Sequence, residues 1–200
     1  MSKKKLFLGV LLILISISTL FISIIPSAYS SNSAGKIYKK IETNFDFLEK
    51  STSPYVLLYF GYVGCTTICK PALSEINNIY GKLDNKKFTF YFINLQENIP
   101  EEFINSYVKS LNKEFNGVYL ETPDIKNIIS KLNVKYVPSR LNDFDIDHSS
   151  FLHVLKKNED NKYEQIFLYT TRPFNIDFII EDLNKIWGTS YVKPIISNFR

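Results

Sequence analysis

YVLLYFGYVGCTTIC, residues 55–69, is the segment from which the architecture of this chain can be inferred. It begins with an apolar run that is hydrophobic on both faces, which predicts a central strand covered by helices on each side. A short turn follows, and then Cys65 and Cys69, the only two cysteines of the chain. Because no other cysteine is present, the pair is not part of a disulfide framework. Two thiols four positions apart after a buried strand predict a reactive site, either a metal clamp or a redox pair.

The patterns on either side of this segment alternate between helix and strand. Ile37, Ile41, Phe45 and Leu48 recur at helical spacing and predict a short first helix. Further helices are predicted from Pro71 to Tyr80 and over 100–115, 122–132 and 175–187, and further strands over 88–93, 118–120, 151–155 and 165–169. Such alternation, ending in a hairpin and a helix, is typical of an α/β, thioredoxin-like fold with a central mixed sheet flanked by helices.

Two helices and one loop carry more detailed expectations. In the helix over 100–115, Phe103, Tyr107 and Leu111 form the predicted buried stripe. The Thr122 hydroxyl is predicted to cap the next helix. The stretch 137–147 has no periodicity and is expected to be irregular.

The N-terminus predicts export and a membrane anchor. Lys3, Lys4 and Lys5 precede an uncharged apolar run at 6–25, which reaches the roughly 20 residues needed to cross a bilayer as a helix. A signal-peptide core is usually only about 7–15 residues, so a retained anchor is favoured, although cleavage after the small residues at 27–30 stays open. The lysines remain cytoplasmic in either case, which predicts a single-pass protein of the bacterial inner membrane with its domain in the periplasm or an equivalent exported compartment. No cysteine lies near this run, so a lipoprotein anchor is excluded.

The predicted organisation has five parts: a basic tip at 1–5, the transmembrane anchor at 6–25, a spacer at 26–36, the domain at 37–190 and a tail at 191–200. The formal charge of the chain is +4 and includes the three N-terminal lysines, so the exported part is nearly neutral. That balance gives no support for nucleic-acid binding.

The position of the two cysteines predicts a stabilised thiolate. Unpaired N–H groups and the dipole at a helix start favour anions, and a thiolate is both the nucleophile and the metal ligand. Thioredoxin-type redox sites have two residues between their cysteines, whereas three lie between Cys65 and Cys69. One helical turn of separation can direct both sulfurs to one point with room for an ion.

Few other soft ligands are present, because the only methionine is Met1 and the only histidines are His148 and His153. In the thioredoxin-like arrangement the segment carrying His148 faces the cysteine loop, so two thiolates and one imidazole form a set suited to Cu(I). Zinc would take a water as a fourth ligand. His153 follows five residues later and is expected on the other face of the same strand. Asp147 is a candidate to orient the imidazole, or is a solvated loop acid.

Plainer interpretations of these residues remain open. The cysteines can form a small structural disulfide, although closing so short a loop restrains the unfolded chain little. His148 can be a loop histidine without a partner.

Three motifs, in order, resemble the SCO/SenC family of copper-binding proteins that help to assemble cytochrome c oxidase. Residues 61–69 are similar to that family's Gly-[Phe/Tyr]-x-x-Cys-Pro-Asp-x-Cys segment, residues 122–125 to its Thr-Pro-Glu helix start, and residues 147–149 to its Asp-His-[Ser/Thr]. The resemblance runs from Tyr55 to Trp187 and implies that Cys65, Cys69 and His148 bind one copper ion, Cu(I) or Cu(II), per chain. It also implies delivery of copper to the dinuclear site of cytochrome c oxidase subunit II, or preparation of its thiols.

The sequence departs from the family pattern at several places. Thr66-Thr67 stands where the family has Pro-Asp, and Lys70 stands where proline is expected. The segment 94–97 lacks the usual Asp-Pro, and the region 33–53 shows no sign of the family's N-terminal hairpin. These departures bear on thiolate reactivity, copper affinity and docking to the client.

The partners implied are subunit II or another copper client, a thiol reductant and another copper chaperone. The main alternative is a membrane-tethered thiol–disulfide oxidoreductase, an enzyme in which Cys65 attacks a client disulfide and Cys69 resolves it through a redox-active disulfide. A peroxidase is a weaker alternative, because no convincing peroxide-binding arginine is found.

Overall fold

The computed structural model describes residues 7, 9, 11–19, 35–43, 45–84, 86–138 and 146–188. The chain divides into two compact units, Met1–Gly35 and Lys36–Arg200. The described residues of the first unit before Gly35 are helical, and no helix among the described residues is both long and apolar enough to cross a membrane. The remainder of the predicted anchor at 6–25, the spacer up to residue 34 and the tail at 191–200 lie outside the described residues.

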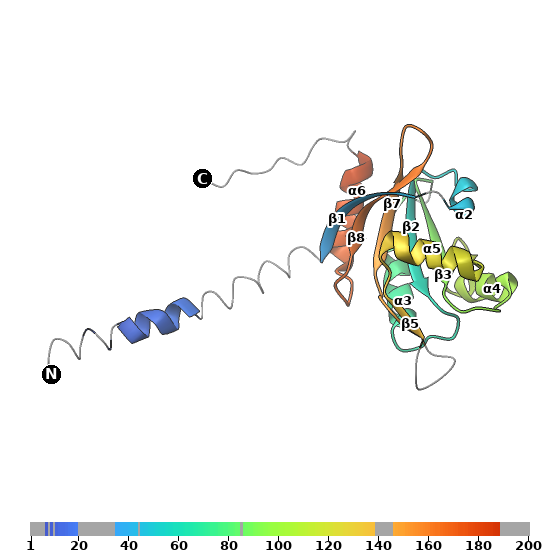
Figure 1. Cartoon of the computed structure of the whole chain (residues 1–200). Helices are drawn as coiled ribbons and strands as arrows, with labels where there is room; N and C mark the ends of the chain where they lie inside the picture. Colours follow the sequence, from blue (N-terminus) through green and yellow to red (C-terminus); the bar gives the residue numbers. More distant parts are fainter. Residues whose placement is uncertain are drawn as a thin grey trace. The chain divides into compact units, whose positions relative to one another are not determined.

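The second unit contains a six-stranded mixed sheet in the order β1-β8-β7-β2-β3-β4 (Figure 1). Its strands are β1 Lys36–Thr43, β2 Tyr55–Gly61, β3 Phe88–Asn94, β4 Asn116–Val118, β7 Leu152–Lys157 and β8 Tyr163–Tyr169. β2, β3 and β4 run parallel, whereas β7, β8 and β1 pair antiparallel. A separate antiparallel pair consists of β5 Tyr136–Pro138 and β6 Ile146–His148.

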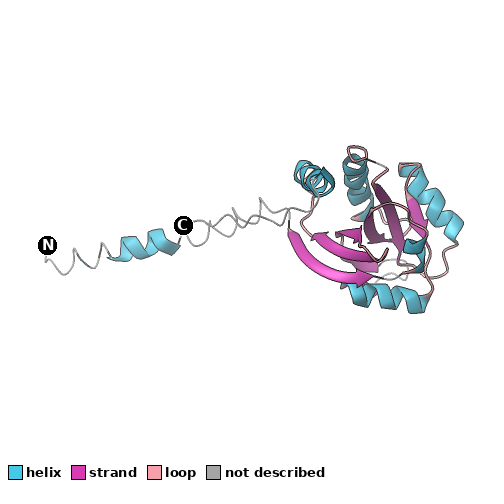
Figure 2. Cartoon of the chain, turned by 90° about the horizontal axis from the view of Figure 1, so that it is seen from above, coloured by secondary structure: helices cyan, strands magenta, loops and turns pink. Residues whose placement is uncertain are grey.

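Helices cover both sides of this sheet (Figure 2). They are α2 Asp46–Glu49, α3 Cys69–Tyr80, α4 Glu101–Leu111, α5 Thr122–Leu132 and α6 Ile176–Gly188. The predicted α/β class, with a central mixed sheet flanked by helices, is confirmed.

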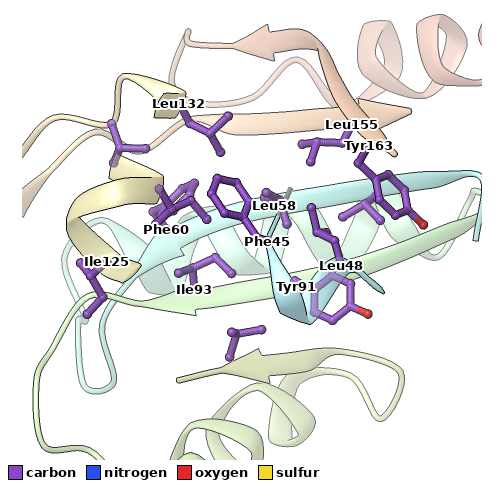
Figure 3. Close-up of a cluster of buried hydrophobic side chains, with 14 of the residues drawn as sticks. Phe45, Leu48, Leu58, Phe60, Tyr91, Ile93, Ile125, Leu132, Leu155 and Tyr163 are labelled. Atoms are coloured by element: carbon purple, nitrogen blue, oxygen red, sulfur yellow. The ribbon is translucent and has the colours of Figure 1, made fainter. Parts of the chain in front are cut away.

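Every residue of β2 is buried, so a layer of packed side chains lies on each face of the sheet. On one face Leu58 and Phe60 pack with Ile93 of β3 and with the apolar side of α5 (Figure 3). The alternate residues of β2 and β3 face α3 and α6: the Tyr55 hydroxyl donates to Ile186 O of α6. β2 is therefore held from both sides, which fixes the point where it ends and the cysteine loop begins.

The predicted first helix is wrong: residues 36–43 form the edge strand β1, paired with β8, and only Asp46–Glu49 are helical. The helical spacing of Ile37, Ile41 and Phe45 is also an even spacing, so it fits a strand equally well. The Thr43 hydroxyl donates to Tyr163 O of β8 at 2.8 Å. Pairing with β8, which no local pattern encodes, selects the strand over the helix.

The predicted buried stripe of α4 is also wrong. Ile104 and Val108 are buried, whereas Phe103 is 60% exposed and Tyr107 and Leu111 are only half-buried. The reason lies in β4: a Cβ on Gly117 would come within 2.6 Å of Ile104 Cγ2, so the missing side chain admits Ile104. The buried face of α4 is therefore shifted by one residue, from Phe103 and Tyr107 to Ile104 and Val108.

Other differences are smaller. The third strand is at Asn116–Val118 rather than 118–120, and the stretch expected to be irregular contributes β5 and β6 at its ends. α5 begins after Glu121 without a side-chain cap, and the Thr122 hydroxyl instead donates to Glu97 Oε1 at 3.0 Å. The boundaries of the remaining elements lie within a few residues of those predicted.

Candidate metal centre

Cys65 and Cys69 lie where β2 passes into α3. Cys69 is the first residue of α3, and its backbone N–H donates to Cys65 Sγ at 3.3 Å. No side chain of the usual polar type caps this helix, so the Cys65 sulfur accepts a hydrogen bond at the helix start. Both cysteines are buried and free. The predicted placement at a strand–helix junction is confirmed.

Two residues of the parallel strands hold the loop against the sheet. A Cβ on Gly61 would come within 3.0 Å of Cys69 Sγ and 2.8 Å of the Phe92 ring, so only glycine lets this sulfur lie against the end of β2. Asn94, fully buried at the end of β3, accepts from Val63 N–H at 3.4 Å and donates to Gln96 O at 2.7 Å. The carboxyl ends of β2 and β3 therefore build the thiol half of the site.

His148 ends strand β6 and reaches the same point from a distant part of the sequence. Its Nε2 lies 3.2 Å from Cys69 Sγ, and its Nδ1 lies 3.2 Å from Ser149 O. Ser149 in turn pairs with Lys135 through a backbone hydrogen bond of 2.9 Å and a side-chain hydrogen bond of 3.2 Å. The rings of Tyr59 and Tyr62 meet the imidazole edge to face. These contacts fix both the position of the ring and the direction of Nε2.

The three side chains form one compact cluster. One ligand atom from each of Cys65, Cys69 and His148 lies within 4.8 Å of the other two. His148 is half-buried, whereas both sulfurs are shielded from solvent. A cavity of about 740 Å³ beside β4 and α5 is lined by none of the three residues, so the cluster is not the floor of that cavity.

The two thiols differ in charge. The pKa of Cys65 is lowered, first because Cys69 hydrogen-bonds to it and further by His148 and by the backbone N–H groups of Cys69 and Ile68. The pKa of Cys69 is raised, first by its interaction with Cys65 and then by burial. Two neighbouring buried thiols cannot both ionise easily. The metal-free site therefore holds one thiolate, on Cys65, and one thiol, on Cys69.

This donor set fits a soft metal ion. Two sulfurs and one imidazole nitrogen are the ligands that favour Cu(I) or zinc over the hard cations, which require oxygen ligands. Ser149 O gives the second imidazole nitrogen a partner, as metal-bound histidines usually require. Binding needs one further event, the loss of the Cys69 proton.

Two other candidate residues lie elsewhere. Asp147 is exposed, and the imidazole nitrogen that it was expected to orient lies against Ser149 O instead. His153 is buried on the opposite face of the large sheet, where its ring packs on Phe60. It is separated from His148 because the two occupy different strands of different sheets, not because of alternation along one strand as predicted.

The sequence did not identify Tyr59, Asn94 and Ser150 as parts of this site. Tyr59 is fully buried, and its hydroxyl lies 2.8 Å from Ser150 Oγ. Burial and the nearby Cys69 raise the pKa of Tyr59, so the phenol keeps its proton. Tyr59 precedes Gly61 by two residues and so shares its face of β2. Its proximity to Ser150 depends on strand pairing that no local pattern contains.

The sequence of this chain is similar to proteins of a single family. The sequence model of the SCO1/SenC family matches residues 47–188. The SCO2-like protein RT0576 of Rickettsia typhi is 27% identical over 170 residues, which are 73% of this chain and 82% of the relative. The SCO2-like protein RP587 of Rickettsia prowazekii is 30% identical over 110 residues, which are 51% of this chain and 53% of the relative. The matched segment thus spans about half the length of the latter protein.

Solved structures show the same fold. ScoI of Arabidopsis thaliana with copper bound superposes with a TM-score of 0.61 at 19% identity, covering 76% of this chain and 99% of that one. Apo Sco1 of Thermus thermophilus gives 0.59 at 20% identity, covering 76% and 92%. Yeast Sco1 with copper bound gives 0.58 at 17% identity, covering 79% and 91%. At these identities the likeness establishes the fold alone.

Proposed function

Because this chain belongs to the SCO1/SenC family, we propose that it binds copper at Cys65, Cys69 and His148 and passes it to a client protein. The observation that carries the proposal is the convergence of two thiols and an imidazole within 4.8 Å. Similar proteins from a plant and from yeast are described with copper bound, which supports copper over zinc for this set. Copper is the cargo of this protein, taken up and released.

The charge of the site supports binding of Cu(I) in particular. One thiolate is already present on Cys65, and loss of the Cys69 proton supplies the second. Two thiolates and a neutral imidazole bind a monovalent soft ion in a low-coordinate site that excludes water. Copper uptake near neutral pH should therefore release about one proton per chain, rather than the two expected from a pair of ordinary thiols.

The proposed client is the dinuclear copper site of cytochrome c oxidase subunit II, with another copper protein as an alternative. The proposed location is the outer face of a bacterial inner membrane, with residues 6–25 as the anchor and Lys3 to Lys5 in the cytoplasm. In such an oxidising compartment a thiol reductant must keep the two cysteines reduced between cycles, and a second copper chaperone must supply the metal.

A thiol–disulfide oxidoreductase is the second candidate, and the lowered pKa of Cys65 favours it. The Cys65 thiolate would attack a client disulfide, and Cys69 would displace the client, leaving a reduced client and a Cys65–Cys69 disulfide for the thiol reductant to restore. The burial of both sulfurs argues against this role, because reactive cysteines are usually partly exposed.

The test is Cu(I) titration of the reduced full chain in detergent, beside Cys65→Ser, Cys69→Ser and His148→Ala. We expect one Cu(I) per chain in the parent and loss of tight binding in each variant. The same four proteins are then assayed for reduction of a model disulfide. Copper binding that is absent from the parent, together with disulfide reduction that survives His148→Ala, would reject the copper proposal and establish the oxidoreductase.

A further inference from the structure

The edge strand β1 carries an exposed aromatic residue directly before two exposed lysines. Tyr38 is 65% exposed, and Lys39 and Lys40 follow it in the strand. β1 pairs with β8 on one side, and no other strand among the described residues pairs with its outer edge (Figure 1). A strand edge of this kind can meet a partner, and charged side chains on it decide which partners are accepted.

These three residues form one side of a basic hollow of about 430 Å³. Its lining also includes Lys156 of β7 and Glu164 and Phe167 of β8. Three lysines and one glutamate give the hollow a formal charge of +2, in an exported part that is nearly neutral. The Tyr38 ring meets the buried Phe167 ring edge to face, with centres 5.0 Å apart. The hollow therefore has a cationic rim and an aromatic floor, which suits an amphipathic, negatively charged ligand.

The start of β1 is held firmly on the sheet. Lys36 Nζ lies 2.6 Å from Asp182 Oδ2 of α6 and 3.7 Å from the centre of the Phe167 ring. Asp182 also accepts a hydrogen bond from the buried Tyr169 hydroxyl. These contacts fix the point where the chain enters the domain, and they use the charge of Lys36 internally. The lysines that follow it in β1 stay at the surface.

The position of the hollow in the chain indicates its partner. Residues 26–35 separate the proposed anchor at 6–25 from β1, and even when fully extended they span at most about 35 Å. Anionic lipids give a membrane surface a negative potential that attracts nearby lysines. Tyrosine is enriched at the boundary between membrane and water. A lipid surface is therefore within reach of the hollow and complementary to it in charge and chemistry.

We propose that the surface formed by Tyr38, Lys39, Lys40 and Lys156 docks on anionic phospholipids of the membrane that holds the chain. This inference rests on the membrane anchoring that is part of the proposed function. The lysines pair with lipid phosphates, and the Tyr38 ring enters the headgroup layer. Each contact is weak, and the anchor makes docking possible by keeping the surface close to the lipid.

Docking through β1 has a consequence for the metal centre. Lys36 pairs with Tyr169, which pairs in turn with Leu152 of β7. Leu152 pairs with Tyr59 of β2, whose ring contacts His148. At the usual spacing between strands, the start of β1 lies about 14 Å across the sheet from Tyr59. A domain docked by β1 therefore keeps its metal centre close to the bilayer, where a client in the same membrane can meet it.

The experiment uses the full chain in lipid vesicles, with tryptophan fluorescence as the probe. The chain has one tryptophan, so Trp187→Phe removes the background signal and Tyr38→Trp introduces a probe in the hollow. The vesicles contain phosphatidylcholine alone or an equal mixture of phosphatidylcholine and phosphatidylglycerol, each with a lipid brominated in its upper acyl chain. Quenching by bromine reports contact of the introduced tryptophan with the bilayer. Co-sedimentation with the vesicles reports insertion of the anchor.

Quenching should be strong in the anionic vesicles and weak in the neutral ones, and about 0.5 M salt should abolish it. Lys39→Gln combined with Lys40→Gln should lower the ratio of docked to undocked protein roughly 30-fold, at about 5-fold per lysine. Lys109→Gln combined with Lys113→Gln is the matched control. It removes the same charge from two exposed lysines at α4, which packs on the opposite edge strand, β4. The control should leave quenching unchanged.

Equal quenching in neutral and anionic vesicles, or an equal loss in the two lysine pairs, would overturn the proposal. So would a tryptophan that the brominated lipid does not quench but whose emission shifts with protein concentration, because a second copy of the chain would then cover the hollow. A chain that does not sediment with the vesicles would reject the anchor and this inference together.

Cu(I) titration of the same proteins separates this inference from copper binding. Neither lysine pair lies at the metal centre, so both variants should bind Cu(I) as the parent does. Docking in a chain that binds no copper would reject the copper function alone. Copper binding in a chain whose hollow does not contact anionic lipid would reject the docking alone.

Discussion

His148 and His153 lie five residues apart and have opposite surroundings. His148 is half-buried, with its Nε2 3.2 Å from a thiol and its Nδ1 against a backbone carbonyl. His153 is 1% exposed and is bonded through Nδ1 to Gln165 Oε1 at 2.6 Å. One ring faces the open end of the parallel strands, whereas the other lies inside the sheet's apolar layer against Phe60.

The position of a histidine in the fold, more than its neighbours in sequence, therefore sets its chemistry. His148 belongs to the small β5–β6 sheet and His153 to the large one. The first has a nitrogen 3.2 Å from the Cys69 sulfur, whereas burial lowers the pKa of the second. Three predictions separate the two roles.

Copper affinity should depend on His148 alone. His148→Ala removes a predicted ligand and should weaken Cu(I) binding more than about 100-fold, beyond the range typical of residues that only support a ligand. His153→Ala removes nothing within reach of the sulfurs and should change affinity less than about 3-fold. Chelator competition on the metal-free reduced proteins measures both. A comparable loss in the two variants would mean that the sheet, and not the imidazole, sets the affinity.

Folding stability should show the reverse dependence. His153→Ala leaves a cavity beside Phe60 and removes the hydrogen-bond partner of Gln165 Oε1. The Nε2 atom of Gln165 already has no hydrogen-bond partner among the described residues. We expect a loss of about 3 kcal/mol in the free energy of unfolding. His148→Ala, at a half-buried position, should cost less than about 1 kcal/mol without metal. Urea unfolding of both variants at pH 7.5 measures these losses. Equal losses of unfolding free energy in the two variants would contradict the different roles assigned to the two histidines.

Acid should destabilise the protein through His153. Burial lowers the pKa of His153 to about 4, with the Gln165 contact partly opposing the shift. The unfolded chain binds this proton near pH 6.5 and the folded chain does not, so stability falls as the pH drops from 6.5 towards 4. Between pH 7 and pH 4.5 the loss attributable to His153 should be roughly 2–3 kcal/mol.

The measurement is urea unfolding of the parent and of His153→Gln at several pH values. The variant should lack this part of the pH dependence, so the difference in stability between the two proteins should shrink on acidification. A difference that stays constant over this range would show that His153 does not titrate as its burial requires.

Much of the site could be predicted from the sequence because its signals are local. The apolar run of β2, the cysteines at the start of α3 and the periodicity of α5 each involve interactions within one element. Errors occurred where an element's environment is set by a distant residue. The pairing of β1 with β8 replaced a predicted helix, and the missing side chain at Gly117 selected the buried face of α4.

The class of chemistry could be inferred from local sequence patterns: two thiols one helical turn apart at a strand–helix junction, in a chain with few other soft ligands. The tertiary structure brings His148 to these thiols, as the family resemblance implied, and adds what no motif contained: the opposite pKa shifts of the two thiols and the contacts of Tyr59 with His148 and Ser150. The two kinds of information differ in how far apart in the sequence the interacting residues lie. Helix starts and strand periodicity depend on neighbouring residues, whereas burial, proton placement and ligand geometry depend on groups that strand pairing brings together across the chain.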